Sequence, residues 1–201
     1  MMTVVARKDS PLNTRSNNSI EAKCDGPLNG RAVNSKAEEQ RGAGKKILRI
    51  YKFLQSESTL VLSTKGADGT VHSTPLFYVV EENLDLLWLS SAGSRHSRHI
   101  NGEPQASIAV FRSTFEWRKI IGVQMHGQCS IVHGSERSPV IHAYCSRFQL
   151  DTVLSFSVSR SLVYRFRPQW VRYIDNQKRF GHKFEVVFEE NPPPWDSRSA
   201  S

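Results

Sequence analysis

Apolar and polar residues alternate along several short segments of the chain, which is the pattern of strands with one buried face. Thr59–Thr64 and Val71–Val80 are two of these segments, and Gly66–Gly69 between them predicts a hairpin turn, because glycine accepts the positive φ that tight turns need. Pro75 lies inside the second segment and has no backbone N–H to donate. We therefore expect that strand to lie at a sheet edge or to contain a bulge.

The same pattern continues toward the C-terminus. Further strands are predicted at Leu84–Leu89, Ala106–Phe111, Ile120–His133, Leu162–Arg167, Gln169–Asp175 and Phe184–Phe188. Helices are predicted over Ile47–Leu54, where apolar residues three or four apart share one face, and over Pro139–Phe148. In the long strand, Gly122 and Gly127 predict bends or the close approach of another backbone. Short antiparallel strands with few helices favour a mainly β (α+β) fold built as a small barrel.

The alternating pattern is absent at both ends of the sequence. Residues 1–44 are rich in Asn, Ser, Gly, Arg and Lys, and their scattered apolar residues follow no period. Such a segment buries too little surface to offset its ordering entropy. We therefore predict a disordered basic N-terminal extension at 1–44, one folded domain at 45–190 and a disordered tail at 191–201, where Pro192–Pro194 stand.

Composition narrows the possible partners. The formal charge of +8 permits an anionic ligand. Aromatic residues do not alternate with Lys and Arg as in base-stacking sheets, so no nucleic-acid partner is expected. No apolar run reaches the roughly 18 residues that span a bilayer, so no membrane partner is expected. Three cysteines without CxxC spacing suit a reducing compartment, and we expect a cytoplasmic protein.

The connection between the strands Leu84–Leu89 and Ala106–Phe111 holds the densest candidate chemistry. Ser90 and Ser91 end the first strand, and Ser94–His96 open a short helix. The first turn of a helix has free N–H groups and a partial positive charge, so it attracts anions. Arginine adds a planar fork that suits phosphate oxygens. We interpret this segment as a phosphate cradle; a solvated basic helix start is the alternative that composition leaves open.

The seven histidines raise the question of a metal or haem. His96 and His99 are the pair whose spacing suits one helix face, and no acidic residue lies near them in the sequence. We therefore predict no metal site. No Ser-His-Asp order and no glycine-rich nucleotide loop stand out, so no catalytic residue is predicted.

Four segments, taken in order, resemble the FMN-binding split barrel of pyridoxamine phosphate oxidase and its relatives. They are LVLSTKGADGTVHSTPLFYVV, WLSSAGSRHSRHINGEPQASIAVF, IIGVQMHGQCSIVHG and WVRYIDNQKRFGHKFEV. The fourth looks like the C-terminal strand of a short bacterial branch whose substrate is unassigned. The resemblance covers about residues 45–190. It implies a split β-barrel of about six antiparallel strands with a few short helices.

The resemblance also implies how a flavin phosphate would be bound. In the family, a serine followed by two basic residues holds the phosphate at this helix start. Ser94, Arg95 and His96 stand in those places, with His96 where the oxidases typically have lysine. Ser90 and Ser91 on the preceding strand would add hydroxyl contacts.

For the isoalloxazine ring, the resemblance implies contacts from two strands. The strand that borders the ring, usually through backbone groups, contains His72, Ser73, Thr74 and Pro75. On the long strand the vitamin-forming oxidase carries a glutamine near the position of Gly122, and here Gln124 lies two residues on, on the same strand face. The oxidase's C-terminal tryptophan and arginine find no match, so the substrate stays unidentified.

The resemblance therefore implies an FMN-binding flavoprotein. The expected activity is that of an oxidoreductase acting on a small molecule, with NAD(P)H as a candidate electron donor. In the family the flavin sits between two subunits, so a homodimer is expected. Deazaflavin and haem are the alternative cofactors. The alternative function is a non-catalytic flavin- or haem-binding protein on the same split barrel.

Overall fold

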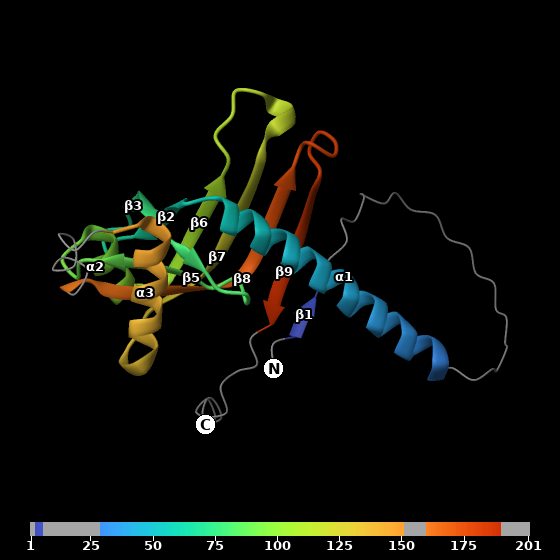
Figure 1. Cartoon of the computed structure of the whole chain (residues 1–201), viewed down its shortest axis with the longest axis horizontal. Helices are drawn as coiled ribbons and strands as arrows, with labels where there is room; N and C mark the ends of the chain where they lie inside the picture. Colours follow the sequence, from blue (N-terminus) through green and yellow to red (C-terminus); the bar gives the residue numbers. More distant parts are fainter. Residues whose placement is uncertain (1–2, 6–28, 151–159, 190–201) are drawn as a thin grey trace.

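The computed structural model describes residues 3–5, 29–150 and 160–189, with side chains in 40–150 and 160–188 (Figure 1). Its strands are β1 Thr3–Val5, β2 Thr59–Lys65, β3 Val71–Phe77, β4 Val79–Val80, β5 Leu86–Ser90, β6 Gln105–Phe111, β7 Ile121–Ile131, β8 Leu162–Asp175 and β9 Lys183–Glu189. Its helices are α1 Asn29–Ser56, α2 Arg95–Gly102 and α3 Arg137–Phe148, with short 3-10 helices η1 Trp117–Lys119 and η2 Gly134–Glu136.

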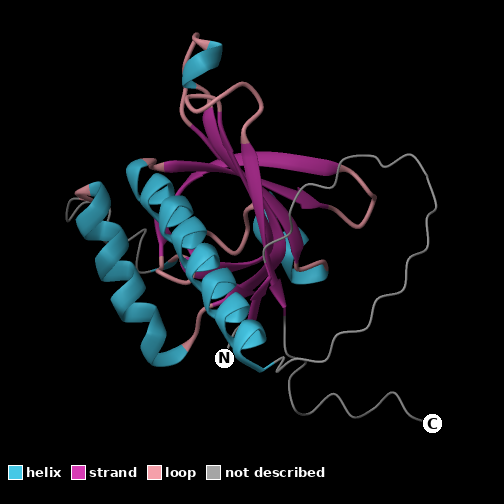
Figure 2. Ribbon diagram, turned by 90° about the vertical axis from the view of Figure 1, so that its right-hand side faces the viewer, coloured by secondary structure: helices cyan, strands magenta, loops and turns pink. Residues whose placement is uncertain are grey.

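The described strands join in one antiparallel sheet. Its order is β1-β9-β8-β7-β6-β2-β3, and β5 pairs with both β4 and β8. Along one edge β8 pairs with β7; along the other, its first part pairs with β5 and its second part with β9. The sheet therefore curls into a half-barrel, with α1 and α3 beside it (Figure 2). The expected mainly β split barrel is confirmed, although nine strands form rather than about six.

Several strand boundaries differ from the predicted ones for reasons of pairing. The predicted strand Val71–Val80 is interrupted at buried Tyr78. Up to Phe77 the chain pairs with β2 as strand β3, and after Tyr78 it pairs with β5 as strand β4. The two predicted strands between residues 162 and 175 are one continuous strand, β8. The short strands β1 and β4 have three and two residues, too few to show a period of two. Pro75 does lie on an edge strand, since β3 ends the sheet order.

Gly127 marks the bulge that bends the long strands. The register between β7 and β8 shifts between His126 and Gly127, which face Trp170 and Pro168 respectively. A Cβ at Gly127 would lie 2.1 Å from the carbonyl oxygen of Arg167. No side chain fits at that distance, so the predicted close approach of another backbone at Gly127 is confirmed.

Helix α1 corrects the predicted N-terminal boundary. Residues 1–44 were expected to be disordered, but α1 already begins at Asn29 and β1 pairs with β9. The helix-forming Ala, Glu, Gln and Lys residues before residue 44 extend a helix that the amphipathic segment from Ile47 nucleates. Residues 6–28 of the predicted extension and the predicted tail at 191–201 lie outside the described residues.

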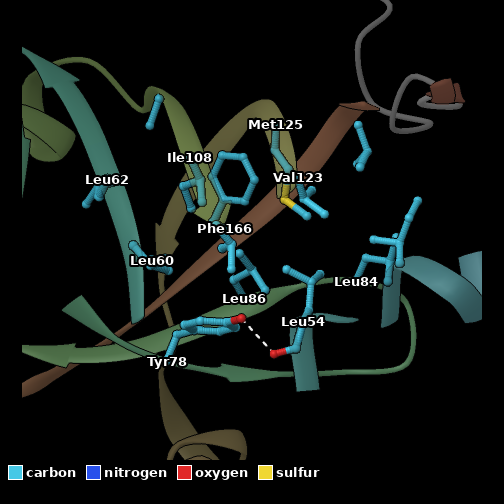
Figure 3. Packing of buried hydrophobic residues seen from close by; sticks show 14 of the residues in the cluster. Leu54, Leu60, Leu62, Tyr78, Leu84, Leu86, Ile108, Val123, Met125 and Phe166 are labelled. Carbon is cyan, nitrogen blue, oxygen red and sulfur yellow. Dashed lines mark hydrogen bonds between the residues drawn. The ribbon is translucent and has the colours of Figure 1, made fainter. Parts of the chain in front are cut away.

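The core lies between α1 and the inner face of the sheet. Leu54 of α1 is fully buried and packs with side chains from β2, β5 and β8, among them Leu62, Leu86 and Phe166 (Figure 3). Each such side chain contributes roughly 1.5–3 kcal/mol when it is buried. The Tyr78 hydroxyl donates to the Leu54 carbonyl at 2.7 Å, and burial raises the pKa of this phenol. Across the described ranges, no helix is both long and apolar enough to cross a membrane.

Candidate cofactor site at the start of helix α2

Helix α2 begins directly after β5, with Ser94 as its N-cap. The backbone of Ser94 is extended, and its hydroxyl accepts a hydrogen bond from the Ser97 amide at 3.3 Å. This geometry satisfies one of the free N–H groups of the first turn. The amides of Arg95 and His96 have no acceptor within the helix. The helix start therefore keeps two N–H donors and a partial positive charge for an anion.

His96 lies underneath this helix start. Its side chain is buried, and its Nε2 atom is 2.8 Å from the Ser90 hydroxyl and 3.1 Å from the Ser94 hydroxyl. Burial lowers the pKa of His96, and the neighbouring His99 lowers it further. The ring is therefore neutral near pH 7 and acts on the site by orienting two serine hydroxyls. It brings together three of the residues that the sequence placed at the phosphate.

Arg95 extends in another direction, toward the edge strand β3. Its Nη1 atom contacts Nε2 of His72, a pair that the sequence had placed at opposite ends of the flavin site. The rings of His72 and His99 lie 6.0 Å apart. These side chains surround an open pocket of about 430 Å³, which we call the α2 pocket; it is lined by Asp68, Thr70, His72, Arg95, Arg98 and His99.

Asp68 is the acidic residue of this pocket. Its carboxylate accepts hydrogen bonds from the amide and the hydroxyl of Thr70, both at 3.0 Å, and these bonds lower its pKa. The carboxylate oxygens are thus engaged within the hairpin turn, while two arginines border the same space. The balance of charge in the pocket is positive.

Sequence reasoning missed His99 and Thr64 as parts of this site. The Nδ1 atom of His99 is 3.1 Å from the hydroxyl of buried Thr64 on β2. His99 also packs against the hairpin, since a Cβ at Gly66 would lie 3.1 Å from its Nε2. Arg95 and His99 are four residues apart and share one helix face. That spacing was visible in the sequence, whereas the contact with Thr64 depends on the fold.

The predicted ring-contact residues on β3 divide between two faces. His72 and Thr74 are half-buried and pair with the buried residues Thr64 and Leu62 of β2. Ser73 and Pro75 are exposed on the opposite, outer face. β3 ends the sheet order, so one edge of its backbone has N–H and C=O groups that pair with none of the described strands. Ser91, at the end of β5, is exposed and accepts from the Gly93 amide at 3.2 Å.

Gln124 lies apart from the other predicted residues. It is exposed on the outer face of β7, and β6 and β2 separate it from β3. The register runs from Gln124 through Ala109 and Val61 to Pro75, which is about 14 Å for strands ~4.8 Å apart. A single chain therefore does not bring Gln124 to the α2 pocket.

The same outer face carries a cluster that the sequence did not reveal. Trp170 stacks on His126 at 5.2 Å between ring centroids, and its indole donates to Glu185 at 3.1 Å. Arg172 donates to the same carboxylate at 2.7 Å, and these bonds lower the pKa of Glu185. The four residues lie on three adjacent strands, β7, β8 and β9. Their proximity depends on the register of these strands, which the sequence pattern does not give.

The curled antiparallel sheet, with a serine-capped basic helix next to an edge strand, defines a protein of the split-barrel class. Residues 49–175 match the family model described as Pyridoxamine 5'-phosphate oxidase. The chain therefore belongs to the pyridoxamine 5'-phosphate oxidase family.

Individual relatives are distant. A UPF0306 protein of Yersinia pestis is 25% identical over 138 residues, covering 68% of this chain and 90% of that protein. Among solved structures, the conserved hypothetical protein Rv2991 from Mycobacterium tuberculosis superimposes with a TM-score of 0.57 and 22% identity, over 65% of this chain and 85% of that one. HutZ, the haem storage protein from Vibrio cholerae, superimposes with a TM-score of 0.52 and 21% identity, over 60% and 87% respectively. These structures share the fold.

Proposed function

We propose that the protein binds FMN, with its phosphate held at the start of α2. The observation that carries the proposal is the α2 pocket, where Arg95 and Arg98 border one positively charged space next to the N-terminus of α2. A phosphate there accepts charge-assisted hydrogen bonds from the arginines and neutral ones from the amides. The Ser94 and Ser90 hydroxyls, which contact His96, lie at the same helix start and are the proposed additional phosphate contacts.

The edge strand β3 is the proposed support for the isoalloxazine ring. It lies beside Arg95, as the contact with His72 shows, and its open backbone edge offers donors and acceptors to the ring heteroatoms. The pocket suits one phosphate group, which favours a mononucleotide. Deazaflavin is the alternative cofactor of the same general shape.

We propose a homodimer, and the position of Gln124 supports it if Gln124 contacts the flavin ring. One chain keeps it about 14 Å from β3, so it can reach a ring on β3 only from a second copy. The outer face between them has exposed apolar residues, including Phe111, which is 60% exposed. Pairing of two outer faces would cover this surface and enclose the flavin.

We further propose that the protein is an oxidoreductase acting on a small molecule, with NAD(P)H as the candidate electron donor. Bound flavin supplies hydride transfer at its N5 atom. The residues of the chain then anchor the phosphate, orient the ring and shape the substrate pocket. The unpaired Cys129 and Cys145 suit a reducing compartment, so the cytoplasm is the proposed location.

Haem binding is the second candidate function. Two imidazoles, those of His72 and His99, face the α2 pocket with their rings 6.0 Å apart, and imidazole is a common axial ligand of haem iron. The similar structure of HutZ is that of a haem storage protein. On this alternative the protein would store or carry its cofactor without turnover.

The test is a titration of the cofactor-free protein with FMN, riboflavin, a deazaflavin and haem. We expect the fluorescence of FMN to be quenched on binding. We also expect the affinity for FMN to be at least about tenfold higher than that for riboflavin, because riboflavin lacks the phosphate. Equal affinity for FMN and riboflavin would contradict the phosphate site, and binding of haem alone would select the second candidate. NAD(P)H oxidation by the FMN-loaded protein then separates an enzyme from a binding protein.

A further inference from the structure

A second and larger pocket lies between α1 and the sheet. It has a volume of about 550 Å³ and is lined by α1 residues from Lys45 to Ser56 together with Arg112, Ile121 and Tyr173. We call it the α1 groove. Figure 1 shows α1 crossing the sheet below the projecting β6–β7 and β8–β9 connections. None of its lining residues belongs to the α2 pocket, and its size is that of small-molecule sites.

The rim of the α1 groove is strongly basic. Lys45, Arg49 and Lys52 follow one another at spacings of four and three, so they share one face of α1. All three are exposed, and none forms an ion pair within the described ranges of side chains. Arg112 completes the rim from the end of β6 and pairs with Glu57 at 2.8 Å. The rim thus retains positive charge that the described acidic residues do not neutralise.

The floor of the α1 groove is apolar and aromatic. Phe53 and Tyr173 pack edge to face with centroids 5.9 Å apart, and Ile121 lies beside them. All three are buried as parts of the core. Leu48 lies at the rim and is 52% exposed. A basic rim over an apolar floor is complementary to a molecule with an anionic head and an apolar body.

The hydroxyl of Tyr173 is the phenolic donor of the α1 groove. Tyr173 is only 5% exposed and lines the α1 groove, yet its hydroxyl makes no hydrogen bond with any described residue. Burial raises the pKa of this phenol, against the opposing effect of Arg49 and Arg112. It therefore stays protonated at neutral pH. A phenol O–H that lines the groove near two guanidinium groups can donate a hydrogen bond to an anion bound there.

We propose that the α1 groove binds a small amphipathic anion, with an apolar or aromatic body and one carboxylate, sulfonate or phosphate. The head group would lie between Arg49, Lys52 and the Tyr173 hydroxyl, and the body would cover Phe53. A free molecule suits the groove better than a bilayer surface, because the apolar floor is buried and, among the described lining residues, Leu48 is the single exposed apolar side chain. This site is separate from the proposed cofactor site and does not depend on it.

The probes are 1-anilinonaphthalene-8-sulfonate, followed by its fluorescence, and sodium decanoate below its micelle concentration as the competitor. We expect saturable binding that decanoate displaces. The double variant Arg49→Glu/Lys52→Glu should weaken both ligands by about tenfold or more, since it replaces attraction by repulsion. Tyr173→Phe keeps the ring and removes only the hydroxyl, and a few-fold weakening is expected. The charge-matched control is Lys46→Glu/Lys65→Glu, because neither lysine lines the groove.

Three results would overturn the proposal. The first is equal affinity for decanoate in wild type and in the Arg49→Glu/Lys52→Glu variant, each checked for a native circular dichroism spectrum. The second is binding to phosphatidylglycerol vesicles without binding to monomeric decanoate, which would indicate a membrane surface instead. The third is displacement of decanoate by FMN, which would place the cofactor in this groove. Arg95→Ala should leave decanoate binding unchanged, so failure of the cofactor site and failure of this proposal give different results.

Discussion

At the scale of residues, Arg95 and His96 are adjacent in the chain but have opposite surroundings. A helix turns successive side chains by about 100°. Arg95 is therefore exposed toward β3, whereas His96 is buried against the serines that end β5 and cap α2. In the proposed phosphate site the positive charge comes from Arg95 and Arg98, whereas His96 is neutral and contacts the hydroxyls of Ser90 and Ser94.

Arg95→Ala should weaken FMN binding roughly tenfold to a hundredfold, because it removes a charge-assisted contact with the phosphate. Riboflavin binding should change little, since riboflavin has no phosphate. The measurement is flavin fluorescence during titration of the cofactor-free protein. Arg118→Ala, an exposed arginine outside the pocket with the same change of charge, is the control. Equal losses of FMN and riboflavin affinity would mean that Arg95 does not contact the phosphate.

His96→Gln should make stability less sensitive to acid. The pKa of His96 in the folded protein is lowered from its ordinary 6.5 by burial. Below about pH 6.5 the unfolded chain takes up a proton that the folded chain does not, so the free energy of unfolding falls as the pH falls, by at most ~1.4 kcal/mol per pH unit. Urea unfolding of wild type and variant between pH 5 and 8 measures this slope.

The control for that slope is His142→Gln, which removes an exposed histidine of α3. Parallel pH profiles for wild type and His96→Gln would show that His96 is not the group responsible.

At the scale of elements, the long strand β8 organises the sheet. It pairs with β7 on one side and with β5 and β9 on the other, and the bulge at Gly127 sets its bend. The bend directs the C-terminal half of β8, which carries Tyr173, under α1, and the N-terminal half toward β5 and the start of α2. The two candidate sites thus lie near opposite halves of one strand.

Gly127→Ala should destabilise the fold by about 3 kcal/mol or more, because the new Cβ would meet the Arg167 carbonyl oxygen and force the backbones apart. Gly44→Ala is the matched control. Its Cβ meets nothing within 4 Å inside α1, so a gain of about 0.5–1 kcal/mol is expected. Thermal unfolding of both variants provides the comparison. A Gly127→Ala protein as stable as wild type would show that the bulge relaxes freely.

At the scale of the whole molecule, the outer face of the sheet is the surface that a single chain leaves open. It presents Gln124, the cluster around Trp170 and the exposed ring of Phe111. Because the α2 pocket and Gln124 belong to different parts of the sheet, the proposed flavin site with Gln124 at the ring is one that we propose two copies form together.

Phe111→Arg should convert the proposed dimer to a monomer, because it would bury a charged side chain between the outer faces. The affinity for FMN should fall in the same variant. Sedimentation at micromolar concentration, with and without FMN, measures both. Leu48→Arg makes a similar change at an exposed residue of α1 and should leave the dimer intact. A monomeric wild-type protein that still binds FMN would contradict the dimer.

The sequence by itself determined the features that depend on neighbouring residues. The turn at Gly66–Gly69, the helix start at Ser94–His96 and most strands follow from local backbone preferences and a period of two. The edge position of Pro75 follows from its missing N–H. The order of the four motifs also indicated the split barrel, because a family's motifs keep their order along the chain.

Only the tertiary structure decided what depends on contacts between distant segments. It joined His99 to Thr64 and Arg95 to His72, and it kept Gln124 away from all of them. It also placed Tyr173 under the basic face of α1. No periodic pattern encodes these contacts, because strand order and the curl of the sheet set which side chains meet. For the same reason α1 begins before any amphipathic pattern: a helix, once nucleated against the core, extends through residues with no packing signal of their own.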